Sequence, residues 1–546
     1  MVFRFTVIIS ILFCAFGLLI WKVYNLQIVH GDYYTARAES EYSALNALTA
    51  SRGLVYFTDK DGNQLPAVVN KDFPVIYAVP KDVEDPEEAA NALSPILNRP
   101  VDELEKLLSK PNDSYELLQK KADQSVAGKI EDLKIKGIYI KTESNRFYPL
   151  AAVASHILGY VGPNSENAGE SGHYGLEEFY NEVLSGVSGD MFGGKVVEPK
   201  QGEDLILTID PNIQIEAERI LANLVGTYKA EGGSVIVEDP KTGKILAMTN
   251  LPNFDPNTYS KYPVADFMNS SVQQIYEPGS VFKVFTMATG IDSGKITPET
   301  TYYDAGSVTL NGWTISNYDL KTHGPYGRVT MTNVVEHSIN TGAVFAERQI
   351  GRTIFSNYLG KFGFSEDTGV DLPGEVKGNL SRLSPKERDV AFATASYGQG
   401  VAVTPVEIIN AASAIANGGN LMRPYLNAAL EPQIVRNVIS AETAREVTQM
   451  MVSAVDRASV AQVAGFSVAG KTGTAFIPDF VHGGYTDRVI DSYIGFAPAT
   501  SPKFVALIKL NNLPSASLAA QSVVPAFRDL TQFIINYYGL QPDRIQ

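Results

Sequence analysis

Between residue 203 and the C-terminus, apolar runs typical of strands flank a long block of helical segments. Strands are expected at Leu205–Ile209, Ser234–Val237, Ile245–Met248, Ser467–Phe476, Ser492–Phe496 and Phe504–Leu510. Helices are expected at Asn212–Val225 and Val524–Tyr538, and Asp239–Lys244 is typical of a hairpin turn. Strands grouped around a block of helices predict an α+β domain with an antiparallel sheet and a helical lobe.

Composition excludes several classes of function. The chain has 546 residues, 45% of them apolar, which is enough for at least two cores. A formal charge of −15 argues against a nucleic-acid partner. The single cysteine, Cys14, rules out an internal disulfide, and the six histidines form no His-x-x-x-His pair. We therefore expect no metal site and no cofactor.

A serine and a lysine three residues apart open a predicted helix. Ser280 and Lys283 lie on one helical face, within reach of each other. The run Val281–Ile291 is apolar almost all round, which indicates a buried helix. Burial disfavours the ammonium form of Lys283, so the pair suits a nucleophile with its own base. A surface serine beside a solvated lysine is the alternative interpretation.

Two further motifs follow in the chain. Ser338-Ile339-Asn340 comes first and Lys471-Thr472-Gly473-Thr474 second, the latter among small and apolar neighbours that favour a strand edge facing a cleft. Second copies of both tripeptides, at Ser165–Asn167 and Lys241–Gly243, precede Ser280 and are interpreted as non-catalytic. His337, beside Ser338, is expected to be structural, because helix neighbours point to different faces.

These three motifs, in this order, resemble the signature of penicillin-binding proteins and class A β-lactamases. Further segments resemble the conserved boxes of class B penicillin-binding proteins: Arg52–Gly62, Arg146–Pro149, Ala154–Gly162, Gly175–Glu178, Leu207–Asp210, Tyr397–Gly400, Thr404-Pro405, Ala416–Gly419 and Tyr493–Pro498. Lys60, Asp61 and Val281 depart from the usual pattern. The chain is therefore identified as a member of that family.

The resemblance implies a D,D-transpeptidase that acts on peptidoglycan stem peptides ending in D-Ala-D-Ala and is acylated by β-lactams. In that family the residue matching Ser280 is the nucleophile and Lys283 its base, while Ser338 relays a proton and Asn340 binds the substrate amide. Lys471, Thr472, Gly473 and Thr474 would bind the substrate and its carboxylate, with Gly473 leaving space for the substrate to lie along the strand. The backbone amides of Ser280 and Thr474 would form the oxyanion hole.

The N-terminal part predicts an anchored protein. Phe5–Trp21 is apolar and uncharged, at the short end of what spans a bilayer. We expect a cytoplasmic tail at 1–4, a transmembrane anchor at 5–24, an elongated α+β pedestal at 25–200 and the penicillin-recognising transpeptidase domain at 201–546. The pedestal is predicted to contain strands at Val75–Val79 and Gly137–Lys141 and helices at Pro86–Leu97 and Val101–Leu108. The resemblance places the catalytic domain outside the bacterial cytoplasmic membrane.

Three alternatives remain beside the transpeptidase. A β-lactamase or D,D-carboxypeptidase would pass the acyl group to water, a β-lactam sensor would stay acylated, and a scaffold would not react.

Asn340 in the second motif and the segment Val524–Asp529 favour the division-type branch over the elongation-type branch. That resemblance implies a SEDS-type glycosyltransferase and other membrane proteins of wall synthesis as partners.

Overall fold

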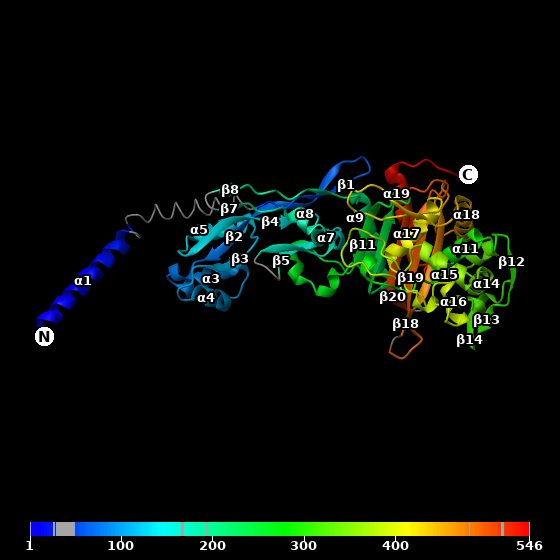
Figure 1. Ribbon diagram of the computed structural model, residues 1–546, viewed down its shortest axis with the longest axis horizontal. Helices are drawn as coiled ribbons and strands as arrows, with labels where there is room; N and C mark the ends of the chain where they lie inside the picture. Colours follow the sequence, from blue (N-terminus) through cyan, green and yellow to red (C-terminus); the bar gives the residue numbers. More distant parts are fainter. Residues whose placement is uncertain are drawn as a thin grey trace. The chain divides into compact units, whose positions relative to one another are not determined.

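Five antiparallel strands form the sheet that the C-terminal half of the chain is built on (Figure 1). In the computed structural model, which describes residues 2–25, 28, 50–164, 169–192, 195–479, 481–514 and 518–544, their order is β11-β10-β20-β19-β18. Their bounds are β10 (Gly232–Glu238), β11 (Ile245–Leu251), β18 (Ala469–Pro478), β19 (Tyr485–Ala497) and β20 (Phe504–Pro514). The predicted antiparallel sheet and the hairpin at Asp239–Lys244 are confirmed.

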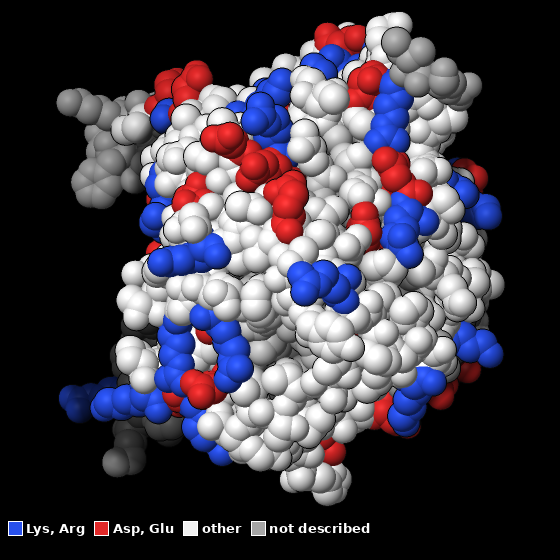
Figure 2. Space-filling view, turned by 90° about the vertical axis from the view of Figure 1, so that its right-hand side faces the viewer, with Lys and Arg blue, Asp and Glu red and all other residues white. Residues whose placement is uncertain are grey.

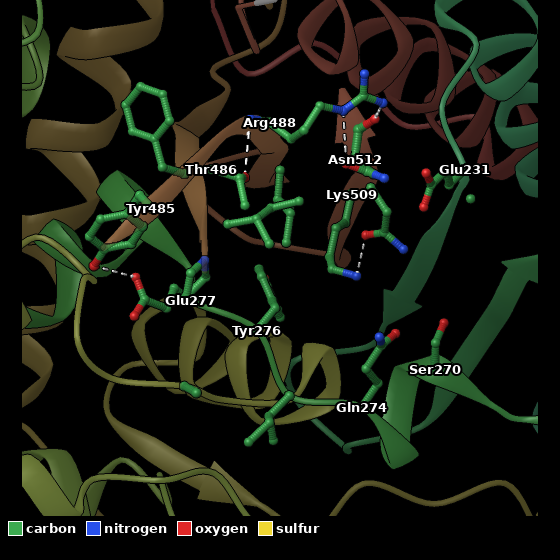
Figure 3. Close-up of a pocket in the computed structure, with 18 of the residues that line it drawn as sticks. Glu231, Ser270, Gln274, Tyr276, Glu277, Tyr485, Thr486, Arg488, Lys509 and Asn512 are labelled. Carbon is green, nitrogen blue, oxygen red and sulfur yellow. Dashed lines mark hydrogen bonds between the residues drawn. The ribbon is translucent and has the colours of Figure 1, made fainter. Parts of the chain in front are cut away.

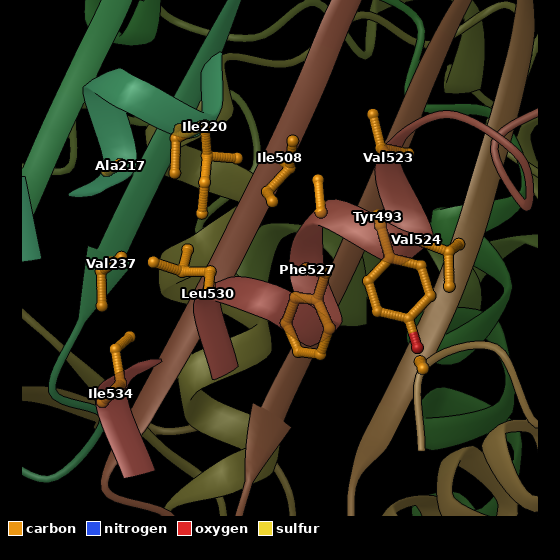
Figure 4. Close-up of a cluster of buried hydrophobic side chains, with 14 of the residues drawn as sticks. Ala217, Ile220, Val237, Tyr493, Ile508, Val523, Val524, Phe527, Leu530 and Ile534 are labelled. Carbon is orange, nitrogen blue, oxygen red and sulfur yellow. The ribbon is translucent and has the colours of Figure 1, made fainter. Parts of the chain in front are cut away.

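Two helices cover one face of this sheet and build the main core with it. Helix α9 (Pro211–Tyr228) begins where the Asp210 carboxylate accepts from the Asn212 and Ile213 amides, and α19 (Val523–Tyr538) closes the chain. Figure 4 shows Ile220, Phe527 and Leu530 from these helices against strand residues such as Ile508. Alternate residues of β20 face this core, as the two-residue period of a strand requires.

The helical lobe lies between β11 and β18 in the sequence. Its helices are α10 (Ser270–Gln273), α11 (Lys283–Asp292), α12 (Leu320–His323), α13 (Met331–Glu336), α14 (Asn340–Ile350), α15 (Arg352–Lys361), α16 (Asp389–Ala395), α17 (Pro405–Ala416) and α18 (Ala441–Ala458). Short 3-10 turns are η3 (Pro256–Lys261), η4 (Val264–Phe267), η5 (Gly279–Phe282) and η6 (Ser381–Leu383). Helix α17 packs on β10 and β20, and a Thr404–Glu407 capping box fixes its start.

Three small antiparallel pairs within the lobe have no counterpart in the sequence analysis. They are β12 (Thr301–Asp304) with β15 (Gly327–Thr330), β13 (Ser307–Leu310) with β14 (Trp313–Ser316), and β16 (Asn420–Met422) with β17 (Ile434–Asn437). Each strand is three or four residues long, too short for a clear period of two. The β13–β14 hairpin lies directly beside the second motif, since Ser316 O accepts from Asn340 Nδ2 at 3.0 Å.

A second sheet carries the N-terminal domain. It contains β1 (Val55–Thr58), β2 (Gln64–Ala78), β3 (Glu116–Gln119), β4 (Ile138–Phe147) and β9 (Leu205–Ile206), with α3 (Pro86–Leu97), α4 (Val101–Leu108) and α5 (Gln124–Leu133) packed against it. The predicted pedestal helices are confirmed. The strands predicted at Val75–Val79 and Gly137–Lys141 are confirmed in place but are longer, because β2 and β4 pair continuously from Val69–Phe147 to Ala78–Ile138. The strand expected at Leu205–Ile209 is wrong in extent: β9 ends at Ile206, because Thr208 N donates to Leu426 O and Asp210 N to Leu246 O.

The structure brings two of the predicted N-terminal boxes together. Arg146 Nε donates to Glu177 Oε1 at 2.7 Å, and both side chains are buried. Tyr148 also donates to this carboxylate, at 3.3 Å. The neighbouring elements are α6 (Ser155–Leu158), β5 (Tyr160–Pro163), β6 (Glu170–His173), α7 (Gly175–Phe179) and α8 (Asn181–Ser185). A buried ion pair therefore joins segments that are 31 residues apart in the sequence.

By internal contacts, Met1–Gly53 and Glu182–Glu203 form one unit, and Leu54–Asn181 with Asp204–Gln546 form another. The first unit contains α1 (Val2–Tyr24) and the pair β7 (Asp190–Phe192) and β8 (Lys195–Val197). Among the residues that the structure describes, no helix has both the length and the apolarity of a membrane span. The anchor at 5–24 stays a prediction, and most of 25–49, the motif copy at 165–167 and Gly193-Gly194 lie outside the described residues.

Candidate active site

Ser280 stands in η5, at the junction of the sheet and the helical lobe. The segment before it is fixed by Tyr276, whose amide and carbonyl both bond to Val403 at 2.9 Å, and by Gly279, whose amide donates to Gly398 O. Gly279 has φ 59°, and a Cβ there would lie 2.9 Å from Thr474 O. Only glycine fits this backbone and this space, which holds the serine against β18.

Lys283 lies under Ser280 and is fully buried. Its Nζ is 3.0 Å from Ser280 Oγ, 3.1 Å from Ser338 Oγ and 2.9 Å from Asn340 Oδ1, and it also donates to the Ser338 carbonyl. All four acceptors are neutral groups. The first two motifs therefore meet at a single amine.

Burial lowers the pKa of Lys283 well below that of a lysine in water. The nearby charge of Lys471 lowers it further, while Asp319 acts in the opposite sense. A lowered pKa leaves a larger fraction of the amine neutral near pH 7, and the Ser280 hydroxyl is only 3.0 Å from it. The arrangement can accept the serine proton.

Ser338 and Asn340 occupy the connection between α13 and α14. Ser338 has φ 55°, an uncommon conformation for a residue with a side chain. Asn340 is the first residue of α14, and its amide is used at both ends: Oδ1 accepts from Lys283 and Nδ2 donates to Ser316 O. The side chain that orients the lysine is thus itself held by the β13–β14 hairpin.

Lys471 comes from β18, one of the two edge strands of the sheet. Its Nζ donates to Ser338 Oγ at 2.9 Å and to the carbonyl and hydroxyl of Thr472 at 3.2 Å. The side chain is buried, and burial lowers its pKa to about 7. Ser338 therefore lies between two lysines, and the third motif joins the other two.

The structure gives Gly473 a different role from the expected one. Gly473 was predicted to leave room for substrate along the strand. A Cβ at this position would instead meet Ser492 Oγ at 2.4 Å, Pro278 O at 2.8 Å and Val281 Cγ2 at 2.8 Å. The glycine is needed because β18 packs tightly against the segment that carries Ser280.

Thr474 is held by a residue that the sequence analysis missed. Its Oγ1 donates to Asp491 Oδ1 at 2.9 Å, and Ser522 donates to the other carboxylate oxygen at 2.7 Å. Asp491 is fully buried and lies opposite Thr474 in the β18–β19 register. Asp491 follows the apolar pair Val489-Ile490 and comes shortly before the mostly apolar run Tyr493–Ala497. An acidic residue in such a segment was the available signal, because buried carboxylates are rare without partners.

A cleft of about 810 Å³ lies above these groups. The predicted residues Ser280, Ser338, Asn340, Thr472 and Thr474 line it, whereas Lys283, Lys471 and Gly473 lie behind its surface. Its walls include Trp313, Tyr318, His337, Arg388, Tyr397, Phe476 and Tyr485. The His337 ring packs on Tyr326 at 4.6 Å between centroids. The volume is in the range of small-molecule sites.

The second copy of the third motif lies elsewhere. Lys241–Gly243 forms the turn between β10 and β11, where Thr242 donates to Asp239 and Gly243 has φ 82°. The same tripeptide thus forms a turn in one place and a cleft strand in another, because its neighbours in the sequence differ.

No cluster of three metal-binding side chains occurs among the residues in the described ranges.

An antiparallel sheet, a helical lobe and a serine–lysine pair at their junction define an enzyme with a serine nucleophile. Residues 233–532 match the penicillin binding protein transpeptidase domain, and residues 47–204 match the penicillin-binding protein dimerisation domain. The chain belongs to the class B penicillin-binding proteins, and its C-terminal domain is their transpeptidase domain.

Relatives match over nearly the whole length. Stage V sporulation protein D of Bacillus subtilis (strain 168) is 31% identical over 91% of this chain and 80% of its own. Peptidoglycan D,D-transpeptidase FtsI of Escherichia coli (strain K12) is 27% identical over 99% of this chain and 93% of its own. The crystal structure of penicillin binding protein 2X from Streptococcus thermophilus shares the fold, with a TM-score of 0.71, 23% identity, and coverage of 90% of this chain and 81% of that one.

Proposed function

We propose that the protein is a membrane-anchored peptidoglycan D,D-transpeptidase that crosslinks stem peptides through an acyl-enzyme on Ser280. The observation that carries the proposal is the 3.0 Å contact between Ser280 Oγ and the buried Nζ of Lys283. A buried amine with a lowered pKa can deprotonate a serine without a histidine. The family membership supports the same chemistry.

In the first step Ser280 Oγ attacks the carbonyl carbon between the last two D-alanines, and Lys283 takes the hydroxyl proton. The C–N bond breaks, D-alanine leaves with a proton, and an ester remains on Ser280. The chain Lys283 Nζ–Ser338 Oγ–Lys471 Nζ, with contacts of 3.1 and 2.9 Å, supports Ser338 as the relay of that proton to the leaving amine. An amine of a second stem peptide then attacks the ester and restores the serine.

Substrate binding is assigned to the β18 residues of the third motif. Lys471 supplies a positive charge and Thr472 a hydroxyl for the terminal carboxylate, the pairing that charge-assisted hydrogen bonds favour. Thr474 lines the cleft too, but its hydroxyl proton is directed at Asp491, so its role in carboxylate binding requires that hydroxyl to turn. Gly473 contributes through its backbone, and Asn340 through its amide.

The backbone amides of Ser280 and Thr474 are proposed as the oxyanion hole. Ser280 lies in the first turn of η5, where amides have no acceptor within the helix. One such donor contributes about 3–4 kcal/mol to stabilisation of the transition state. A β-lactam ring would be opened by the same attack and leave a stable ester.

The location and domain boundaries belong to the proposal as well. We assign the N-terminal tail to residues 1–4, a single-pass anchor to 5–24, the pedestal to 25–200 and the transpeptidase domain, outside the cytoplasmic membrane, to 201–546. Support for the anchor comes from apolar side chains of α1 that are exposed in the isolated chain, among them Phe13 at 80% and Trp21 at 63%. A lipid bilayer would cover them.

A septal role and a SEDS-type glycosyltransferase partner are proposed on family resemblance alone. Both a peptidoglycan D,D-transpeptidase FtsI and a stage V sporulation protein D are similar to this chain. The assignment to the division-type branch therefore rests on the segment Val524–Asp529 and on Asn340. On the face shown in Figure 2, basic and acidic side chains are interspersed.

Intact-protein mass after incubation with a penicillin tests the proposal. Wild type is expected to gain one adduct that persists for hours, Ser280→Ala none, and the exposed-site control Ser109→Ala the same as wild type. An adduct that is lost within seconds favours the serine hydrolase instead. A folded wild-type protein that gains no adduct favours the non-catalytic scaffold.

A further inference from the structure

A second cavity, of about 1060 Å³, adjoins the catalytic cleft. The two share Arg382, Gly400, Phe476, Gly484 and Tyr485 in their walls. Between them Tyr485 donates to Glu277 Oε2 at 3.0 Å. The second cavity contains none of the eight predicted site residues, so its chemistry is separate from that of Ser280.

Lys509 is the buried charge of this cavity. It lies on β20, and only 2% of its surface is exposed. Its Nζ donates to Asn511 Oδ1 at 2.6 Å and lies 4.8 Å from the centre of the Tyr276 ring. Figure 3 shows Lys509 and Asn512 on the strand side of the cavity, with Tyr276 and Gln274 across from them.

In the described part of the chain, Lys509 has no counter-charge. Among the residues that the structure describes, no carboxylate lies within ion-pair distance of it, and Asn511 is its one hydrogen-bond acceptor. Burial alone lowers the pKa of Lys509 to about 7. When protonated, Lys509 has three N–H groups and one acceptor in the protein, so two donors remain for groups that enter the cavity.

The acidic groups of the cavity are directed elsewhere. Glu277 accepts from the Gly400 amide at 3.0 Å and from Tyr485, so both of its oxygens are occupied. Asp479 accepts from the Val481 amide and is paired with His482. Glu231 is an exposed residue of the wall. Lys509 is therefore the only fully buried charged side chain among the described residues that line the cavity.

Most of the remaining wall is apolar. Met268 and Ile275 are 42% and 39% exposed, high values for such side chains, and Leu251, Pro252, Val401 and Phe476 continue the surface. Apolar walls with a few fixed polar groups are typical of small-molecule sites. The walls would bind an apolar body, and the cation a negatively charged head.

We propose that this cavity is a second binding site, for a carboxylate that carries an apolar group. The carboxylate would accept from Lys509 Nζ, with the apolar group against Met268 and Ile275. Arg382, which is exposed and lines both cavities, would add positive charge at the rim. The site goes beyond the transpeptidase reaction and does not depend on it.

The test is calorimetric titration of the full-length protein, in a neutral detergent, with N-acetyl-L-phenylalanine and with its uncharged amide. Wild type already acylated by a penicillin is titrated too, because the Ser280 cleft is then filled. We expect saturable binding of the acid in both forms, and binding of the amide weaker by at least about tenfold, the value of one charged hydrogen bond.

Two variants and one control locate the site. Lys509→Met keeps the volume and removes the charge, so binding of the acid is expected to weaken by at least about tenfold. Met268→Trp enlarges a side chain of the apolar wall while Lys509 is retained, and it has the same expected effect, which covers the case in which Lys509→Met does not fold. Lys503→Met, an exposed lysine just before β20, should bind as wild type does.

Several results would overturn the proposal. They are no saturable binding to wild type, equal affinity for acid and amide, equal affinity in wild type and both cavity variants, and loss of binding on acylation by penicillin. The last result would locate the probe in the Ser280 cleft. A protein that binds the acid but is not acylated would contradict the proposed function and leave the second site standing.

Discussion

Lys471 Nζ and Ser338 Oγ lie 2.9 Å apart, and the same hydroxyl is 3.1 Å from Lys283 Nζ. One serine thus separates two buried amines whose positive charges repel each other. Burial lowers the pKa of both amines, and the charge of Lys471 lowers that of Lys283 further. The pair can hold one proton more easily than two, which suits a site that must accept a proton and then return it.

Replacing Lys283 by arginine tests the base directly. A guanidinium keeps the charge but cannot give up its proton near neutral pH. We expect acylation by penicillin to slow by about 10²–10⁴-fold, the usual contribution of a general base. Stopped-flow acylation kinetics measure it, with Lys295→Arg, an exposed lysine after α11, as the unchanged control. Acylation within threefold of wild type would exclude Lys283 as the base.

The acylation rate is expected to rise and then to fall as the pH increases. It rises as Lys283 loses its proton, because only the neutral amine is a base. It falls as Lys471 loses its proton near its pKa of about 7, because the cation attracts the penicillin carboxylate. In Lys471→Arg the guanidinium stays charged, so the alkaline fall should disappear. A fall that persists unchanged in this variant would assign it to another group.

Gly473→Ala is expected to displace the segment that carries Ser280 and so to slow acylation. The added Cβ would lie 2.4 Å from Ser492 Oγ and 2.8 Å from Pro278 O, so the segment bearing Ser280 must move. A displacement of about 1 Å lowers rates by about 100-fold. Gly226→Ala in α9 is the control, since its Cβ meets nothing within 4 Å. Acylation kinetics compare the two, and equal rates would refute the packing argument.

Arg146→Met should destabilise the N-terminal domain. It leaves the Glu177 carboxylate buried without its guanidinium, which costs about 3–5 kcal/mol. The double variant Arg146→Met/Glu177→Leu should recover much of the loss, because no charge stays buried. The free energy of unfolding of the single and the double variant is measured by urea unfolding, with limited proteolysis as the readout. The exposed pair Lys136–Glu84 supplies the control, and Lys136→Met should show no measurable change.

The sequence allowed the central strands to be predicted well, since their apolar runs are long and their turns are marked. Helices α3 and α4 also begin and end where their prolines, acidic first turns and apolar spacing indicate. The short hairpin β13–β14 carries no such pattern. Its position matters because Ser316 accepts from Asn340, a contact between residues 24 apart.

The sequence predicts which residues form the site, but not what each of them does there. The three motifs identify the reactive groups, because such residue types in that order have few other uses. The function of Gly473 depends on what lies behind β18, and that is known only once Pro278 and Val281 are in place. Asp491 holds Thr474 across two strands, a pairing set by register rather than by any local pattern.

The crowding around Gly279 limits how this enzyme can evolve under antibiotic selection. A Cβ on Gly398 would lie 2.2 Å from Gly279 O, and one on Gly279 would meet β18, so neither position tolerates a side chain. Trp313 and Tyr318, in the cleft wall, are 63% and 59% exposed and can change without disturbing the backbone. Substitutions that confer resistance while sparing the natural reaction should therefore accumulate in the walls rather than around the nucleophile.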